Sequence, residues 1–269
     1  MEFLLSSFIH RNEIFTHFQT IIHKIFCFKL NPINLDFSPP DLNDLVLSLL
    51  SATFGFLILM MQVVFKDTQV PRWMVRKITH IISDTYIAFI VAFFHSLLGI
   101  LMAIGSFFFI LLLLVVFTRF KFLTEFVFLN SRENERNYSI MINALLTVGV
   151  MLGLFFIFHK QPVVFTAGCL AVAWGDASGE FVGKKIPVVK YTLFNQKSIS
   201  GSFAVFLFSG LGFFISGLFY SVPLALDWIW KILLGGFGCA IFEAFSWKWL
   251  DNLYLSPFGS LIMLWIVAF

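Results

Sequence analysis

Long apolar runs separated by short polar segments dominate the chain from about residue 45 onward. Because a hydrocarbon core ~30 Å thick is crossed by about 20 helical residues, each run of that length predicts a transmembrane helix. The pattern predicts spans at Leu45–Phe65, Ile78–His95, Leu97–Phe117, Ile140–Phe158, Pro162–Val182, Gly201–Tyr220, Trp228–Trp247 and Leu253–Phe269. The last span is short and contains Pro257, so it also fits a re-entrant or interfacial segment. We therefore expect an all-α fold, a polytopic integral membrane helical bundle with about seven or eight transmembrane helices.

The segment before this region has a different pattern, in which apolar residues mix with basic residues and histidines. We expect an N-terminal amphipathic, interfacial extension over residues 1–44, followed by a transmembrane domain over residues 45–269. The N-terminus has no basic region ahead of its short apolar run, so we do not expect a cleaved signal peptide.

Composition agrees with a membrane protein. Hydrophobic residues make up 59% of the chain and charged residues 12%, whereas a soluble domain carries roughly 25% charged residues. The formal net charge of +3 gives no reason to expect nucleic acid as a partner. Cys27, Cys169 and Cys239 have neither metal-ligand spacing nor a disulfide framework, so we expect buried thiols.

Most of the 18 Lys and Arg residues fall in alternate loops between the predicted spans, and these loops would share one side of the membrane. Short loops rich in Lys and Arg are retained in the cytoplasm. We therefore expect this side to be cytoplasmic, or its equivalent in an organelle, with the membrane itself left open. The polar clusters described next all lie on it.

The first cluster opens the second predicted span, where Arg76, Lys77 and His80 are followed by Asp84. His80 and Asp84 are four residues apart and share one helical face. In a functional interpretation, Arg76 and Lys77 neutralise phosphate and His80 donates a hydrogen bond or carries a proton. The alternative is membrane anchoring by the basic residues and a simple intrahelical His80–Asp84 pair.

The second cluster is a polar segment from Trp174 to Ser202, which begins at the end of a run long enough to cross a bilayer. Asp176 and Glu180 lie one helical turn apart in it, at a depth where an unpaired carboxylate costs ~2.5 kcal/mol or more. Paired carboxylate oxygens with open positions for water and phosphate suit Mg²⁺. The segment therefore predicts a metal-bound phosphate site.

Gly175, Gly179 and Gly183 form a stripe beside these carboxylates, with a spacing of four residues. Such stripes are common where two membrane helices pack closely, although they also let a nucleotide or a metal approach the helix. Gly183-Lys184 lacks the earlier glycine and the following Ser or Thr of a GxxxxGK[ST] loop. If the chain is a phosphotransferase, it is not of the P-loop type.

The third cluster is Glu243 in the seventh predicted span, with Asp251 and Asn252 just beyond that span. Glu243 lies at membrane depth and should pair with a cation or a metal. A salt bridge to Lys248 is the alternative, but a separation of five residues is poor helical geometry. Asp251 and Asn252 alone would also fit a helix cap.

Taken in order, these motifs resemble a known family. They are Arg76-Lys77-Ile78-Thr79-His80, Gly175-Asp176 through Glu180 to Gly183-Lys184, Lys197-Ser198-Ile199-Ser200-Gly201-Ser202, and Glu243 with Asp251-Asn252. Over about Arg72 to Pro257 the chain resembles the polyprenol kinase family, which includes dolichol kinase, phytol and farnesol kinases and a CTP-dependent diacylglycerol kinase. It departs from the family at Glu180, where Asp is frequent, and at Ile186-Pro187, which replace an aromatic-Gly-Lys sequence.

The resemblance implies a membrane lipid-alcohol kinase that transfers the terminal phosphate of a nucleoside triphosphate, with CTP the expected donor and Mg²⁺ the expected cofactor. The implied catalytic residues are Asp176, Glu180, Lys197, Glu243 and Asp251, and the implied metal ligands are Asp176, Glu180 and Glu243. The implied nucleotide and phosphate ligands are Arg76, Lys77, His80, Lys184, Ser198, Ser202 and Asn252. Asp176 or Asp251 would orient or deprotonate the lipid hydroxyl.

The acceptor stays open between an isoprenoid alcohol of the phytol, farnesol or dolichol type and diacylglycerol. One rival is an enzyme similar to phosphatidate cytidylyltransferase, which would release pyrophosphate, although its usual Ser-x-Lys-x-x-x-Gly order differs from Lys197-Ser-x-x-Gly201. The other is a transporter or non-catalytic scaffold. A transporter should show repeated halves and polar residues near the bilayer midplane. The sequence shows no internal repeat, and its polar clusters gather at one face.

Overall fold

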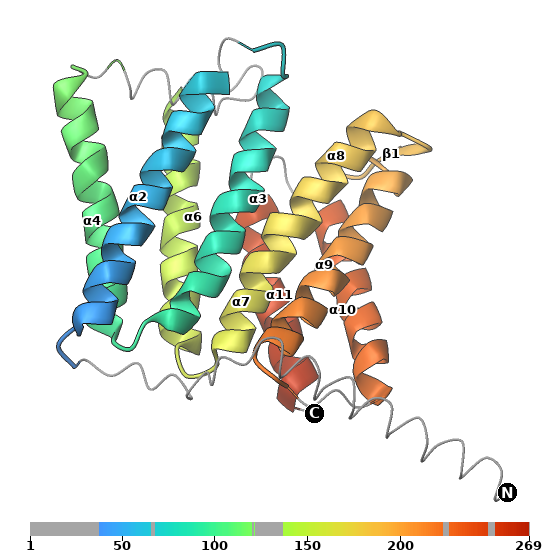
Figure 1. Cartoon of the computed structure of the whole chain (residues 1–269). Coiled ribbons are helices and arrows are strands. Elements are labelled where there is room, and N and C mark those ends of the chain that lie inside the picture. The colour runs from blue at the N-terminus through green and yellow to red at the C-terminus, as the bar shows by residue number, and fades with distance from the viewer. Residues whose placement is uncertain are drawn as a thin grey trace, which may run out of the picture.

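The computed structural model describes residues 38–65, 68–119, 121, 137–222, 226–246 and 251–268, which form a helical bundle with one short hairpin (Figure 1). The helices are α2 (Leu42–Phe65), α3 (Arg72–Ile90), η1 (Val91–Phe93), α4 (Leu97–Phe117), α6 (Asn137–Phe158), α7 (Pro162–Leu170), η2 (Ala171–Asp176), α8 (Ala177–Lys185), α9 (Ile199–Phe219), α10 (Leu226–Ala244) and α11 (Asp251–Ala268). The hairpin pairs β1 (Lys190–Thr192) with β2 (Gln196–Ser198) in antiparallel register, with Tyr191 opposite Lys197.

The predicted helical class is confirmed for the described residues, whereas the hairpin was not expected. Three helices, α2, α4 and α9, are long and apolar enough to cross a membrane by length and composition. A helical membrane protein therefore fits the structure, and the number of seven or eight spans stays a prediction. Residues 1–37 of the predicted N-terminal extension lie outside the described residues.

The helix that contains the second predicted span, Ile78–His95, starts before that span and ends within it. The helix α3 begins at Arg72, directly after Pro71, and ends at Ile90, where the short 3-10 helix η1 takes over. Hydropathy marks the apolar part of a helix, and it therefore missed the first turns, which carry basic side chains. As a result Arg76 and Lys77 lie within the helix and not in a loop ahead of it.

A buried aspartate organises the end of the bundle at which α2 and α4 begin. Asp44 is fully buried, and its carboxylate accepts hydrogen bonds from the His95 backbone N–H at 2.8 Å and from Ser96 Oγ at 2.5 Å. Ser96 in turn caps α4, because its Oγ accepts the Gly99 backbone N–H at 3.0 Å. The break that separates the predicted second and third spans is thus confirmed near Ser96.

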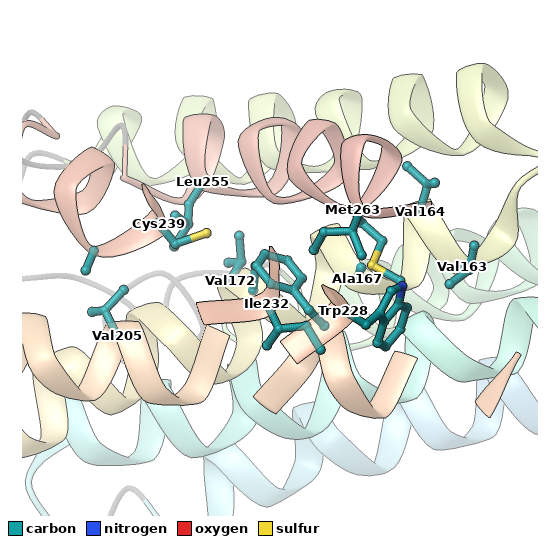
Figure 2. Close-up of a cluster of buried hydrophobic side chains, with 14 residues drawn as sticks. Val163, Val164, Ala167, Val172, Val205, Trp228, Ile232, Cys239, Leu255 and Met263 are labelled. Carbon is teal, nitrogen blue, oxygen red and sulfur yellow. The ribbon is translucent and has the colours of Figure 1, made fainter. Parts of the chain in front are cut away.

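The main apolar core lies between α7, η2, α9, α10 and α11 (Figure 2). Phe213, Met263 and Cys239 are among its fully buried side chains, and Trp228 of α10 is nearly so. Cys169 is also fully buried, so the predicted burial of the thiols is confirmed for Cys169 and Cys239. Cys27 lies outside the described residues.

The glycine stripe lies against α9, as expected for a helix-packing motif. A Cβ atom added at Gly175 would clash with Ser209 Oγ. In the opposite direction, a Cβ at Gly201 of α9 would lie 2.8 Å from the backbone oxygen of Gly179. Each helix thus requires small residues on the other, and this contact fixes α8 beside the start of α9.

This packing predicts that Gly201→Ala destabilises the fold by about 1–3 kcal/mol, because the atom it meets is backbone and cannot turn away. Gly105→Ala in α4 is the matched control, since nothing lies within 4 Å of its added Cβ. The control should be neutral or more stable by up to ~1 kcal/mol. Thermal unfolding of the purified variants in detergent measures both, and equal midpoints would contradict the close contact.

Candidate functional site

A change of helix type places Asp176 in the site. From Pro162 to Lys185 the chain is continuously helical, but the segment η2 is a π-helical turn that ends at Asp176. Trp174 in this turn donates its Nε1–H to Thr85 Oγ1 of α3 at 2.8 Å. Single π turns within α-helices are frequently found at functional sites, because they change the direction of the side chains that follow.

Lys77 of α3 joins the two carboxylates of the predicted metal site. Its ammonium donates a hydrogen bond to Asp176 Oδ2 and lies 3.1 Å from Glu180 Oε2. The side chains of Lys77 and Asp176 are only 3% and 5% exposed, whereas that of Glu180 is 19% exposed. A buried carboxylate needs such a partner, because an unpaired charge in an apolar interior is strongly unfavourable.

Two further cations surround Glu180 on the more exposed side. Arg76 Nη2 lies 3.4 Å from Glu180 Oε2, and Lys184 Nζ donates to Glu180 Oε1 at 2.7 Å. Lys184 also lies over the ring of Trp73, 4.4 Å from its centroid. The structure therefore brings together the predicted residues of the first two clusters, which are about 100 residues apart in the sequence.

Lys197 and Glu243 form a second ion pair, in which the Glu243 side chain is 7% exposed and the Lys197 side chain 19%. Lys197 lies on β2, and its ammonium donates a hydrogen bond to Glu243 Oε1 of α10. The hairpin is also tied to the end of α10 through Asn195, whose side-chain N–H donates to the Ser246 carbonyl at 3.0 Å. The charge of Lys197 acts on Asp176, so the two ion pairs belong to one electrostatic cluster.

This cluster lies at one end of the bundle, where α3 begins, α8 ends and α9 begins (Figure 1). The Asp44 network lies at the opposite end, where α2 and α4 begin (Figure 1). The expectation that the polar clusters gather on one face agrees with this arrangement. The identity of the compartment that this end faces stays a prediction.

The predicted phosphate-binding serines have structural partners. Ser198 Oγ accepts the Gly201 backbone N–H at 3.1 Å and caps α9. Ser202 Oγ lies 2.6 Å from the hydroxyl of Tyr191 on β1. Both contacts fix the hairpin against α9 and so help to place Lys197, and contact of these serines with phosphate stays a prediction.

The remaining predicted site residues are placed less directly. His80 lies 3.1 Å from Asp84 through Nδ1 and Oδ2, which is the intrahelical pair that the sequence allowed. Asp251 is the first residue of α11, directly followed by Asn252. The side chains of Asp251 and Asn252 lie outside the described residues, so their predicted roles are not tested.

Sequence reasoning missed several contacts that shape the site, among them Tyr191, Asn195 and Trp73. The strands β1 and β2 have three residues each, too short to leave an alternating pattern in the sequence. Trp73, three residues before Arg76, was a weak signal in the sequence, because Trp is the aromatic residue that best binds a cation over its ring.

The donor set around Lys77 fits a divalent cation. A single positive charge bridges Asp176 and Glu180, and Mg²⁺ favours carboxylate oxygens that leave positions for water and phosphate. Glu243, the third predicted metal ligand, is paired with Lys197. Asp176 and Glu180 would therefore be the first residues to hold the ion, and its binding stays a prediction.

Another trio, Asp41, Asp44 and His95, brings three possible metal-ligand atoms within 4.8 Å of one another. The groups of this trio are already bonded to one another. Asp41 accepts the Asp44 backbone N–H at 2.7 Å and lies 2.8 Å from His95 Nδ1, and both contacts lower the pKa of the Asp41 carboxyl. We interpret the trio as the structural anchor of α2 and α4.

Comparison with known proteins agrees coarsely with the sequence motifs. The chain is 29% identical over 134 residues to a phytol kinase from Synechocystis sp.. The match covers 49% of this chain and 55% of the relative, so the chain spans about half the length of the curated relative it matches. No family model and no solved structure matches the chain. The chain is thus distantly similar to a phytol kinase.

The buried geometry predicts strong coupling between Lys77 and Asp176. Lys77→Met and Asp176→Leu should each lower the free energy of unfolding by about 3–5 kcal/mol, because the first leaves the buried Asp176 carboxylate without its cation and the second leaves the buried Lys77 ammonium with only the half-buried Glu180. The double variant should lose clearly less than the sum of the two. Unfolding in detergent measures this cycle.

The control is the pair Asp227 and Lys231 on α10, 2.8 Å apart, in which the Asp227 side chain is 59% exposed. An exposed pair on one helix contributes little to stability, because solvent and salt screen its charges. The corresponding cycle should therefore show almost no coupling. Equal coupling in the two cycles would contradict the central place given to Lys77.

Proposed function

We propose that this protein is a membrane lipid-alcohol kinase, which transfers the terminal phosphate of a nucleoside triphosphate to the hydroxyl of an isoprenoid alcohol. The observation that carries the proposal is the buried bridge of Lys77 between Asp176 and Glu180, with Arg76 and Lys184 beside it. The distant similarity to a phytol kinase supports the same reaction class.

The charge arrangement suits phosphoryl transfer, which depends on positioning and charge neutralisation more than on covalent catalysis. In the structure the cations and carboxylates neutralise one another. A triphosphate with its Mg²⁺ would exchange these partners: phosphate oxygens would take the ammonium and guanidinium groups, and the metal would take the carboxylates. Each charged group would have a partner of opposite charge before and after this exchange, so it need not leave a buried charge unpaired.

The charge of each residue would then determine its role. Lys77 and Lys197 would bind the triphosphate, with Arg76 and Lys184 at the more exposed rim. Asp176 and Glu180 would hold Mg²⁺, which would supply further neutralisation of the phosphate charge. Glu243 would keep Lys197 oriented or join the metal ligands.

For the substrates, we propose CTP as the donor and an alcohol of the phytol type as the acceptor. The apolar tail would lie among the helices and the bilayer, and the nucleotide would enter from the end of the bundle that carries the basic residues. We propose that this end faces the cytoplasm, since most Lys and Arg residues lie in its loops.

Isotope position distinguishes the proposed reaction from cytidylyl transfer. The protein, purified in detergent and supplied with Mg²⁺, would be incubated with γ-labelled CTP, ATP or GTP and with phytol, farnesol, dolichol or diacylglycerol. We expect the γ label in a lipid product, with CTP and phytol the best pair. Appearance of the α label in the lipid would instead indicate a cytidylyltransferase, and no transfer to any lipid by folded protein would overturn the proposal.

Asp176→Asn tests the carboxylate directly. The amide oxygen can still accept a hydrogen bond from Lys77, so the fold should survive, but the negative charge for a metal is lost. We expect phosphate transfer to fall by about 100-fold or more, while circular dichroism and monodisperse elution stay unchanged. Asp227→Asn at an exposed position is the matched control and should keep full activity. Full activity of Asp176→Asn would refute the assignment.

A further inference from the structure

Two buried polar atoms of α3 have no hydrogen bond to any described residue, His80 Nε2 and Asp84 Oδ2. His80 Nδ1 lies 3.1 Å from this Asp84 oxygen, close to it but not aligned as a hydrogen bond. The other Asp84 oxygen accepts from Ser83 Oγ at 3.2 Å, and Asp84 as a whole is 8% exposed. A buried polar atom left unsatisfied costs about 1–3 kcal/mol. Such atoms in a native fold often mark the place of a ligand.

The two residues lie between the ion cluster and the apolar core. With a rise of ~1.5 Å per residue, His80 lies ~4.5 Å and Asp84 ~10 Å beyond Lys77 along the helix axis. Lys77, which pairs with Asp176, is three residues before His80 on the same helix, so the two side chains are neighbours on the helix surface. One turn beyond Asp84, Ala88 is fully buried in an apolar cluster with Phe94 and Leu170.

This order matches the shape of a lipid alcohol, which has one hydroxyl on an apolar chain. Its hydroxyl must reach the phosphate at the level of Lys77 while its tail stays in apolar surroundings. Lys77 has no lone pair to accept the hydroxyl proton, and Asp176 and Glu180 are engaged by cations. His80 Nε2 can carry a lone pair and has no hydrogen bond to a described residue, so it can accept the hydroxyl proton.

We propose that His80 binds the hydroxyl of the lipid alcohol and takes its proton, and that Asp84 positions His80. The inference rests on the kinase function proposed above and names the acceptor side of that site. The Asp84 carboxylate favours the tautomer with the proton on Nδ1, which leaves the Nε2 lone pair for the alcohol. His80 is then a catalytic residue, and Asp84 acts through it.

The alcohol oxygen forms a bond to the γ-phosphorus, and its proton moves to His80 Nε2. The bond between the γ-phosphorus and the oxygen that bridges to the β-phosphate breaks, and the nucleoside diphosphate leaves with that electron pair. The imidazolium formed on His80 is stabilised by Asp84 and returns its proton to solvent after product release.

The kinetic test uses His80→Gln and Asp84→Asn in the full chain, with CTP and phytol as substrates. General-base catalysis typically contributes 10²–10⁴-fold, so we expect kcat of His80→Gln to fall by about 100-fold or more. Asp84→Asn should lower kcat by a smaller factor, and neither should change KM for CTP. His159→Gln is the control, because its ring lies against the carbonyl of Phe156 in its own helix turn and should leave kcat unchanged.

Binding supplies a second readout that does not depend on turnover. Wild-type protein should bind phytol about 10-fold more tightly than 2-phytene, the matching hydrocarbon that lacks only the hydroxyl, and His80→Gln should lose this preference. If the wild type transfers phosphate and His80→Gln keeps its kcat, the inference is overturned while the kinase function stands. If no phosphate is transferred, the kinase function fails, and the phytol preference alone decides whether His80 binds a hydroxyl.

Discussion

The ion pair between Lys77 and Asp176 is the constraint on which the polar end of this bundle depends. Each side chain is almost fully buried, and neither would be tolerated there alone. The pair joins α3 to η2, and the π-helical turn of η2 is held to α3 a second time by Trp174. Because both contacts act between the same two elements, they fix η2 against α3. The position of Glu180, one turn further along, follows from this connection.

The second constraint is steric, and it determines where Lys197 lies. The glycines at 179 and 201 let α8 and α9 approach until a single added methyl group would meet backbone. The start of α9 is therefore held beside the end of α8, and Ser198 caps it there. The hairpin that leads into α9 carries Lys197 to within electrostatic reach of Asp176. Close packing thus brings two segments that are apart in the sequence together in one charged site.

Local spacing explains which parts of this arrangement the sequence could predict. Helical periodicity alone predicts that Asp176 and Glu180 share one face of a helix. A stripe of glycines predicts close packing against another membrane helix. The partner of Asp176 is 99 residues away, and spacing carries no information about such pairing. The phosphate role of Ser198 was implied by the family resemblance and stays a prediction, whereas the helix cap that Ser198 forms was not expected. The hairpin escaped prediction because its strands are too short to show a pattern.

The two deeply buried aspartates, Asp44 and Asp176, differ in the groups that satisfy their charge. Asp44 is satisfied by the His95 backbone N–H and by the short Ser96 hydroxyl, groups that cannot leave without breaking the start of α4. Asp176 is satisfied by Lys77, whose long flexible stem can turn toward a phosphate while the helices stay in place. A carboxylate held by fixed backbone groups has no reason to exchange its partners, whereas one held by a mobile cation can. The same charge, deeply buried in both places, is therefore an anchor at one end of the bundle and, in the proposed function, a binding group at the other.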